Sequence, residues 1–250
     1  MLELYHAEPV ANSLKTLLCC KEKGIDFVSH YVDLFRFEQH RPEFVALNPN
    51  GQVPVLVHDG AVITESSVIN EYLDELFTDI PLIPGDPVQR AQMRIWNKYV
   101  DEYLLPAVSM IGWHNMVRRF ARTIARGEME AILSHIPLKE QRDKWATVAG
   151  DSFTEAQLDD SRRRIATALA RAEQLLARSH WMAGPLYSLA DISHLAALNS
   201  LPRLCPDLFN EQSTPRNHAW YRRMGERSAV QAALAMENRV PEGFRSFGEQ

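Results

Sequence analysis

The amino-acid sequence predicts an α/β domain followed by an all-helical domain, and three observations lead to that prediction. Residues 1–80 carry strand and helix patterns in the order β-α-β-α-β-β-α, with the short connections of a compact domain. Pro, Gly and Asp then cluster between residues 81 and 87, where they interrupt regular structure. After this cluster the patterns are helical. We therefore predict a first domain over residues 1–80, a linker over 81–86 and a helical domain over 87–250.

The composition excludes several classes of protein. Of the 250 residues, 46% are hydrophobic and 24% are charged, and the formal net charge of -5 gives no electrostatic reason to expect nucleic acid. The longest apolar stretches are too short to cross a membrane, and residues 1–9 have neither the basic nor the apolar part of a signal peptide. We expect a cytoplasmic protein with no membrane and no nucleic-acid partner.

Cysteine and histidine are not spaced as metal ligands. The three cysteines, two of them adjacent at Cys19 and Cys20, form neither a CxxC pair nor an even-numbered disulfide framework. His6, His58 and His194 stand singly, without a His-x-x-x-His pair. We expect reduced, mostly buried thiols and no metal.

The chain begins with the pattern of a βαβ unit. Residues 2–6 alternate between apolar and polar side chains, as a half-buried strand does, and residues 27–32 give a second strand. Between them, Asn12 and Ser13 are good helix-capping residues ahead of leucines at helical spacing, and Gly24 is a typical helix stop. This order is the usual start of an α/β domain.

After a short helical connection over residues 37–47, residues 48–64 indicate a loop and a hairpin. Asn-Pro and Asn-Gly pairs open the loop, a β-branched run follows, and Asp-Gly at 59–60 closes a tight turn. Pro54 removes a backbone donor, so we expect it where the strand begins, with nearby backbone free to face a ligand. Its peptide bond can also adopt the cis form far more readily than other bonds.

Glu65 and Ser66 precede apolar residues that recur at helical spacing over 68–76. They therefore stand at a helix N-terminus, where free backbone N–H groups and the helix dipole favour an anion. Taken one at a time, Ser66 is most simply a helix cap and Pro54 a residue at a strand edge.

The second half of the chain carries helical patterns. Pro87 suits the first residue of a helix whose apolar face continues to Leu104. Pro106 is expected to kink or break this helix, which resumes over 108–120. Residues 121–150 are poorly periodic and predict an insertion of helix and loop.

Three further segments complete the helical pattern. Apolar residues at helical spacing over 158–176 predict a long amphipathic helix. Ser188 is followed three residues later by Asp191, which is close to a capping box and predicts the start of a buried helix. Residues 220–236 give one or two last helices.

The loop over residues 48–56, taken together with Glu65 and Ser66, resembles the glutathione-binding half of the glutathione transferases. Those proteins have a thioredoxin-like domain with a cis-Pro loop and a Glu/Ser pair at its third helix. The pair Ser188 and Asp191 is similar to a motif of their C-terminal domain, so the resemblance covers both halves of the chain. It implies a thioredoxin-like first domain, an all-helical transferase domain and glutathione as co-substrate.

The resemblance places the thiol-stabilising group at the start of the first helix, where Ser13 is the main candidate and Asn12 could share the role. A serine hydroxyl can donate a hydrogen bond to a sulfur anion beside a helix N-terminus. Bringing a thiol pKa from ~8.5 to about 6.5 takes roughly 2.7 kcal/mol, which one charged hydrogen bond of ~1.5–3 kcal/mol and a dipole contribution of about 0.3–1 kcal/mol can supply. No cysteine stands at this turn, which argues against a glutaredoxin-like mechanism. A capping role for Ser13 is compatible with this one.

By the same resemblance, a larger set of residues holds the glutathione peptide. These residues are Gln39, His40, Gln52, Val53, Pro54, Glu65 and Ser66. The first three match the end that holds the glycine carboxylate, the backbone of Val53 pairs with the cysteinyl unit, and the last two bind the γ-glutamyl head. A carboxylate at Glu65 suits the ammonium of that head, and the helix N-terminus suits its carboxylate.

Segments over nearly the whole chain are similar to a narrower group, the bacterial β-etherase glutathione transferases that cleave β-aryl ethers of lignin. The similar segments are residues 11–15, 37–40, 51–54, 58–60, 64–66, 100–103 and 111–113. The residues that this resemblance places in a substrate pocket are Tyr103, Met110, Trp113, His114, Asn115 and Met116. It implies a hydrophobic aromatic substrate, an α-keto aryl ether from which a thiolate displaces a phenol.

Two other functions remain open on the sequence alone. One is a different glutathione transferase, such as a dehalogenase, an isomerase or a general detoxifying conjugating enzyme. The other is a non-catalytic binding module with this fold, against which the joint presence of Ser13, Gln52 and Glu65 argues. The resemblance also implies a dimer, and a homodimer and a heterodimer with a paralogue are both open, as are the acceptor and the stereochemical preference.

Overall fold

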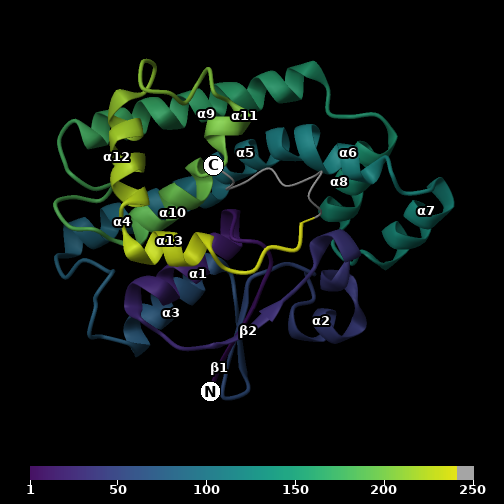
Figure 1. Cartoon of the computed structure of the whole chain (residues 1–250), viewed down its shortest axis with the longest axis horizontal. Helices are drawn as coiled ribbons and strands as arrows, with labels where there is room; N and C mark the ends of the chain where they lie inside the picture. Colours follow the sequence, from purple (N-terminus) through teal and green to yellow (C-terminus); the bar gives the residue numbers. More distant parts are fainter. Residues whose placement is uncertain (241–250) are drawn as a thin grey trace.

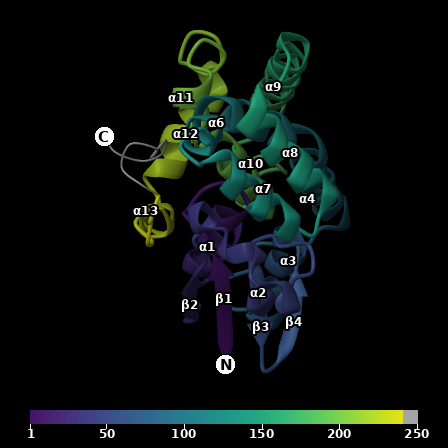
Figure 2. The same ribbon diagram turned by 90° about the vertical axis from the view of Figure 1, so that its right-hand side faces the viewer.

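The computed structural model describes residues 1–240, and its first domain is built on one mixed sheet in the order β2-β1-β3-β4 (Figure 2). The strands are β1 (Leu2–His6), β2 (Val28–Tyr31), β3 (Val55–His58) and β4 (Ala61–Thr64). β1 pairs parallel with β2 and antiparallel with β3, and β4 returns antiparallel to β3 after a turn at Asp59 and Gly60. The predicted order of strands and helices is confirmed, and the pairing is that of a thioredoxin-like sheet.

Side chains that alternate along β1 divide the first domain into layers. Leu2 and Leu4 point into the core that they share with α1 (Ala11–Lys23) and α3 (Ser66–Leu76). Tyr5 instead packs with Phe44 of α2 (Pro42–Leu47), and the centroids of the two rings are 6.3 Å apart. The 3₁₀ turns η1 (Leu34–Arg36) and η2 (Glu38–His40) lead into α2, so the predicted helical connection over 37–47 consists of two short elements.

The rest of the described chain is helical, as predicted, and lies above the sheet in Figure 1. Its elements are α4 (Pro87–Tyr99), η3 (Val100–Leu104), α5 (Leu105–Gly112), η4 (Trp113–Val117), α6 (Arg118–Ala121), α7 (Arg126–His135), α8 (Lys139–Gly150), α9 (Glu155–Leu176), α10 (Leu189–Leu198), α11 (Leu201–Leu204), α12 (Pro215–Gly225) and α13 (Ser228–Leu234). Pro87 is the first residue of α4, as expected. The predicted helical domain extends to residue 250, and residues 241–250 lie outside the described part.

Of the two outcomes predicted for Pro106, a kink or a break, the break does not occur. The backbone stays helical from α4 to α6 and widens into π turns at η3 and η4. Proline has no N–H to donate to the carbonyl of Glu102, four residues earlier. The guanidinium of Arg164, on α9, donates instead to the carbonyls of Glu102 at 3.3 Å and Tyr103 at 2.7 Å. A neighbouring helix therefore satisfies the backbone acceptor that Pro106 leaves open.

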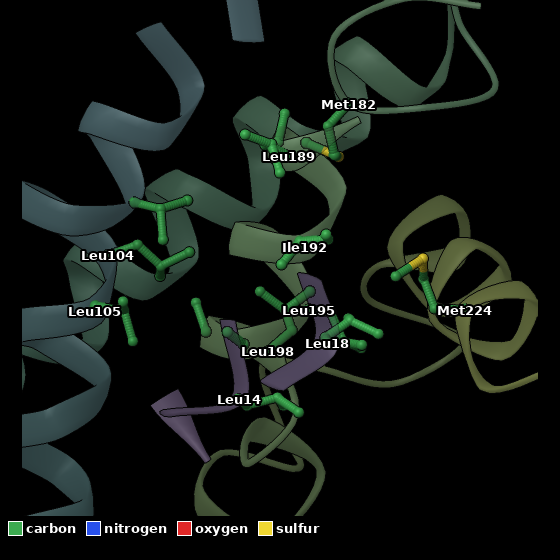
Figure 3. Packing of buried hydrophobic residues seen from close by; sticks show 14 of the residues in the cluster. Leu14, Leu18, Leu104, Leu105, Met182, Leu189, Ile192, Leu195, Leu198 and Met224 are labelled. Carbon is green, nitrogen blue, oxygen red and sulfur yellow. The ribbon is translucent and has the colours of Figure 1, made fainter. Parts of the chain in front are cut away.

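One hydrophobic core joins the two domains. Figure 3 shows Leu14 and Leu18 of α1 against Ile192 and Leu195 of α10, and all of these side chains belong to the same buried cluster. α1 therefore contacts α3 of the first domain as well as α10 and α13 of the helical domain. Because burying such side chains contributes about 1.5–3 kcal/mol each, this contact fixes how the domains sit together.

The predicted capping box at α10 is confirmed. Ser188 and Asp191 exchange side-chain-to-backbone bonds, and the Asp191 carboxylate also accepts from the backbone of Met182 and from the indole of Trp220 at 2.9 Å. Burial raises the pKa of Asp191 to about 6. Four donors at one carboxylate tie α10 to α12 and to the chain before it.

Candidate active site

A cavity of about 310 Å³ lies where the first domain meets the helical domain. The first domain lines it with Ala7, Glu8, Val10, Ala11, Asn12, Ser13, Leu34, Phe35, Gln39, His40, Gly51, Gln52 and Val53. The helical domain lines it with Leu105, Val108, Ser109, Gly112, Trp113, Met116, Val117, Gln141, Trp145, Ala196, Asn199, Ser200 and Leu204. The wall from the first domain therefore carries more of the polar side chains and the wall from the helical domain more of the apolar ones, a common pattern for a small-molecule site.

The start of α1 presents Asn12 and Ser13 to the cavity, but neither residue is the cap that the sequence predicted. The helix begins at Ala11, and its cap position is Val10, two residues before Asn12, with no side-chain capping bond. The hydroxyl oxygen of Ser13 instead accepts a bond of 3.1 Å from the N–H of Ala7. Because that oxygen is already an acceptor, the hydroxyl hydrogen of Ser13 is available for an anion in the cavity.

The loop before β3 is held by its own side chains. Asn48 donates from its amide to the carbonyl of Gln52 at 2.7 Å and accepts from the N–H of Asn50 at 3.1 Å. The Val53–Pro54 peptide bond is cis, and β3 begins at the next residue. This places Gln52 and Val53 on the cavity wall, where Ser13 also lies.

Gln39 and His40 form a buried polar pair at the same end of the cavity. Gln39 Nε2 lies 3.3 Å from His40 Nε2. The other polar atom of each side chain, Gln39 Oε1 and His40 Nδ1, is buried without a hydrogen-bond partner within residues 1–240. Burial lowers the pKa of His40 to about 4, so its ring is neutral at physiological pH. Because the amide of Gln39 donates to His40 Nε2, the ring hydrogen of His40 is on Nδ1, which can donate to a carboxylate, whereas Gln39 Oε1 needs a donor from the ligand.

Glu65 and Ser66 stand at the start of α3, as predicted, with Glu65 at the cap position in the left-handed region (φ 68°). Neither side chain caps the helix, so the simple capping role for Ser66 is wrong. The Ser66 hydroxyl donates instead to Asn12 Oδ1 at 3.3 Å. Although Glu65, Ser66 and Pro54 are not among the lining residues, this bond connects the start of α3 to the cavity.

A buried charge network supports the junction of α1, α3 and η3. The ammonium of Lys15, which is fully buried, donates to Ser67 Oγ at 2.7 Å and to Asp101 Oδ1 at 2.6 Å. Ser67 donates in turn to the other oxygen of Asp101 at 2.5 Å. The three groups satisfy one another, so the network links α1 and α3 of the first domain to η3 of the helical domain at Ser67, the residue after Ser66.

The predicted pocket residues of the helical domain divide into two sets. Trp113 and Met116 line the cavity. The other four, Tyr103, Met110, His114 and Asn115, are not among its lining residues. Tyr103 stacks on Tyr99 at 4.9 Å, the sulfur of Met110 accepts a bond from Ser161, His114 Nδ1 lies 2.7 Å from Ser152 Oγ, and Asn115 is exposed.

Sequence reasoning missed the contribution of α8. Trp145 of this helix lines the cavity and meets Trp113 edge-on, with ring centroids 4.9 Å apart, and Phe37 at 4.7 Å. The predicted insertion over 121–150 consists mainly of α7 and α8, and it forms a small core of its own with Trp113. The one signal of this contribution in the sequence was Trp145 itself, because a large aromatic side chain in a poorly periodic stretch is usually packed against other residues.

Glu8 is a second residue that the sequence did not single out. It lines the cavity five residues before Ser13, its side chain is buried, and Glu8 Oε2 has no hydrogen-bond partner within residues 1–240. Burial raises the pKa of this carboxyl group above its usual range. An acidic proton donor or acceptor is therefore available beside the start of α1.

Among the described residues, no group of three or more His, Cys, Asp and Glu side chains could hold a metal ion. Cys19, Cys20 and Cys205 are buried and unpaired, as predicted. None of the helices within residues 1–240 combines the length and the apolar character that a membrane span needs.

Family models and known relatives agree on one family. The model of the glutathione S-transferase N-terminal domain matches residues 11–76, and that of the C-terminal domain matches residues 106–228. Protein LigF from Sphingobium sp. (strain NBRC 103272 / SYK-6) is 40% identical over 244 residues, which cover 95% of each chain. Glutathione S-transferase F14 from Arabidopsis thaliana is 26% identical and covers 90% of this chain and 79% of its own.

Solved structures give the same result. The crystal structure of beta-etherase LigF from Sphingobium sp. strain SYK-6 superposes with a TM-score of 0.90 at 40% identity, over 94% of this chain and 99% of that one. The structure of FzlA from C. crescentus has a TM-score of 0.74 at 26% identity, over 96% and 94% of the two chains. The resemblance inferred from the sequence is confirmed, and the chain belongs to the glutathione S-transferase family.

Proposed function

We propose that this protein is a glutathione-dependent β-etherase that cleaves the β-aryl ether bond of lignin-derived α-keto aromatic compounds and releases a phenol. The observation that carries the proposal is the 40% identity to LigF over 95% of both chains, because LigF is described as a beta-etherase in its crystal structure. The cavity supports it, since Ser13 and an aromatic wall that includes Trp113 and Trp145 border the same space.

Bound glutathione supplies the sulfur nucleophile, and Ser13 is the group that we assign to the sulfur anion. Its hydroxyl accepts from Ala7 and is left with one hydrogen to donate. The first N–H groups of α1 lie beside it, at the positive end of the helix dipole. Asn12, whose side chain is oriented by Ser66, is the second candidate for the same role.

We assign the glutathione peptide to the first domain. The neutral pair Gln39 and His40, with Gln52 beside it, suits the glycine carboxylate because amide and imidazole N–H groups can donate to it. Glu65 and Ser66 suit the charged γ-glutamyl head at the start of α3.

Calorimetry tests this assignment. Glu65→Ala and Ser66→Ala should each weaken glutathione binding, because either change leaves a charged end of the peptide unpaired. Glu43→Ala, an exposed residue of α2, is a matched control that should bind normally. Unchanged affinity for glutathione in both site variants would mean that the peptide does not bind at Glu65 and Ser66.

The aromatic wall suits a flat aryl ether. Phe35, Trp113 and Trp145 line the cavity, and aromatic pairs contribute about 0.5–1.5 kcal/mol each beyond their buried area. The departing phenoxide corresponds to an acid with a pKa near ~10, so its departure is less demanding than that of an alkoxide. Positioning of the reacting atoms supplies much of the remaining rate.

The test of the proposed function is product analysis with three substrate classes. With glutathione and an α-keto β-aryl ether, the protein should release a free phenol and a β-glutathionyl ketone. If it consumes only an alkyl halide or an enone, the protein is a different glutathione transferase. If it binds glutathione and transforms none of the three, the binding-module alternative holds.

We also propose that the protein is a dimer and that it is cytoplasmic. Exposed apolar side chains at Val68 and Leu76 of α3 and at Val88 and Ile95 of α4 support a partner that covers these helices. Because glutathione transferases usually pair, a second copy of this chain is the first expectation, and a paralogue is the alternative.

A further inference from the structure

Lys144 of α8 points its charge at the wall of the cavity. Its ammonium donates to Ser109 Oγ at 2.9 Å and lies 4.5 Å from the centre of the Trp113 ring. Ser109 and Trp113 both line the cavity. Lys144 is half-buried and has no carboxylate partner within residues 1–240, whereas Lys139 on the same helix is exposed and pairs with Asp143.

The direction of the bond between Lys144 and Ser109 follows from their chemistry. An ammonium can only donate, so the oxygen of Ser109 must accept. The hydroxyl hydrogen of Ser109 is then free, and it has no acceptor among the described residues. Ser109 is thus an available hydrogen-bond donor at the cavity wall, and the Lys144 ammonium bound to its oxygen strengthens it as a donor.

Ser109 and Ser13 lie on different walls of the cavity. Ser13 borders the cavity from the first domain, and Ser109 borders it from α5 of the helical domain. Direct displacement at carbon requires the sulfur and the departing oxygen to be on opposite sides of the reacting carbon. A group that assists the departing oxygen must therefore come from a different wall than the group that holds the sulfur.

We propose that Ser109 is a catalytic residue that donates a hydrogen bond to the departing aryl ether oxygen, and that Lys144 is a positioning residue that orients Ser109 and resupplies its proton. The proposal rests on the β-etherase function proposed above and adds the acceptor half of the site to it.

The step balances without any further reactant. A carbon–sulfur bond forms from the thiolate electron pair as the carbon–oxygen bond breaks, and that bond pair stays on the phenoxide oxygen. The phenoxide takes the Ser109 hydroxyl proton, and Ser109 takes one from the Lys144 ammonium. Burial lowers the pKa of Lys144 to about 8, below the ~10 of a phenol, so this transfer runs toward the free phenol. Lys144 regains its proton from water after the phenol leaves.

The test is a leaving-group series measured on Ser109→Ala and Lys144→Met. The substrates are α-keto β-aryl ethers whose phenols run from a nitrophenol, a good leaving group, to a methoxyphenol, a poor one. We expect kcat/KM to fall about 100-fold with the methoxyphenol ether, in the range of general acid catalysis, and less than about 3-fold with the nitrophenol ether. The dependence on leaving-group acidity should therefore become steeper in both variants.

Three further variants serve as controls. Lys139→Met on the exposed face of α8 and Ser134→Ala on α7 should keep the wild-type dependence on leaving-group acidity. Lys144→Arg keeps the charge and the donor, so it should recover part of the loss that Lys144→Met shows.

Two results would overturn the proposal, and they differ from a failure of the proposed function. An equal loss with every phenol would mean that Ser109 and Lys144 only maintain the cavity or act on another part of the substrate. No loss in either variant would mean that the pair does not assist the reaction. If the wild-type protein itself releases no phenol from any ether, the β-etherase function fails together with this proposal.

Discussion

Ser13 lies where the first helix, the cavity and the backbone of Ala7 meet, and its side chain is fixed by a bond that a helix cap would not make. We expect Ser13→Ala to raise the pKa of the bound glutathione thiol and to slow turnover roughly ten- to a hundredfold, since ~1.4 kcal/mol corresponds to each factor of ten. Ultraviolet titration of the thiolate and steady-state kinetics measure the two effects. A larger effect of Asn12→Ala than of Ser13→Ala would transfer the role to Asn12.

Glu8 gives a prediction about stability. Because burial raises the pKa of Glu8, the folded protein holds this proton more tightly than the unfolded chain does. The protonated carboxyl group of Glu8 therefore contributes to the free energy of unfolding below the pKa of ~4.3 that Glu8 has in the unfolded chain. This contribution is lost as the pH rises through the higher pKa of Glu8 in the folded protein. We expect Glu8→Gln to raise the unfolding midpoint at pH 7 by roughly 2–4 °C, for about 1 kcal/mol, with the difference from wild type disappearing near pH 4.

The control for this prediction is Glu43→Gln, which changes an exposed carboxylate of the first domain. It should leave the midpoint unchanged at both pH values. A midpoint for Glu8→Gln that is lower than wild type at pH 7 would mean that the charged carboxylate is favourably paired in solution.

At the scale of single residues, the sequence predicts where a side chain lies along a helix better than it predicts which group that side chain bonds to. It places Asn12, Ser13 and Ser66 at the starts of the right helices, because capping residues and apolar spacing mark helix ends. It does not predict that Ser66 bonds to Asn12 or that Ser13 bonds to Ala7, because these partners meet only when the sheet has formed.

The loop over residues 48–54 carries Gln52, Val53 and Pro54 of the predicted peptide site and lies against His40. Gly51 has φ 61°, and a Cβ built there would lie 2.6 Å from His40 Nδ1. We expect Gly51→Ala to displace His40 and to weaken glutathione binding severalfold in calorimetry.

Gly60, in the turn between β3 and β4, is the matched control. It also has a positive φ, of 86°, but a Cβ there would meet nothing within 4 Å. Gly60→Ala should share the backbone strain of about 1 kcal/mol and leave the affinity unchanged. Equal losses of affinity in the two variants would show that global strain, not His40, is responsible.

Elements are predicted well where they bury a continuous face and poorly where they face the cavity. The long apolar stripe of α9 and the capping box of α10 are evident in the sequence. α8 buries only Trp145 and Val148, and part of its surface lines the site, so its periodicity is weak. For the same reason the sequence missed Lys144, whose role depends on Ser109 from another helix.

At the scale of the whole molecule, the exposed apolar residues of α3 and α4 lead to a prediction about assembly. We expect light scattering at micromolar concentration to give a dimer for the wild-type protein. Ile95→Glu, with or without Val88→Glu, should shift it toward monomer because a buried unpaired charge opposes association. Leu186→Glu, at an exposed leucine outside these helices, should remain dimeric. A wild-type monomer would contradict the prediction.

The two-domain arrangement itself could be predicted, since strand and helix patterns and the Pro-rich stretch before α4 follow from local sequence. The cavity could not, because it depends on how α1 packs against α10 and on where α8 lies over the first domain. Of the helical-domain residues that line the cavity, the sequence therefore predicted only Trp113 and Met116.

Chiral product analysis with glutathione and the separate enantiomers of an α-keto β-aryl ether tests the central claim most directly. Direct displacement by a thiolate held at Ser13 predicts that a free phenol is released and that the attacked carbon of the glutathionyl ketone is inverted. Reaction with one enantiomer alone would also reveal the stereochemical preference. Release of phenol with retention or with a racemic product would contradict direct displacement, and no phenol from either enantiomer would contradict the β-etherase function.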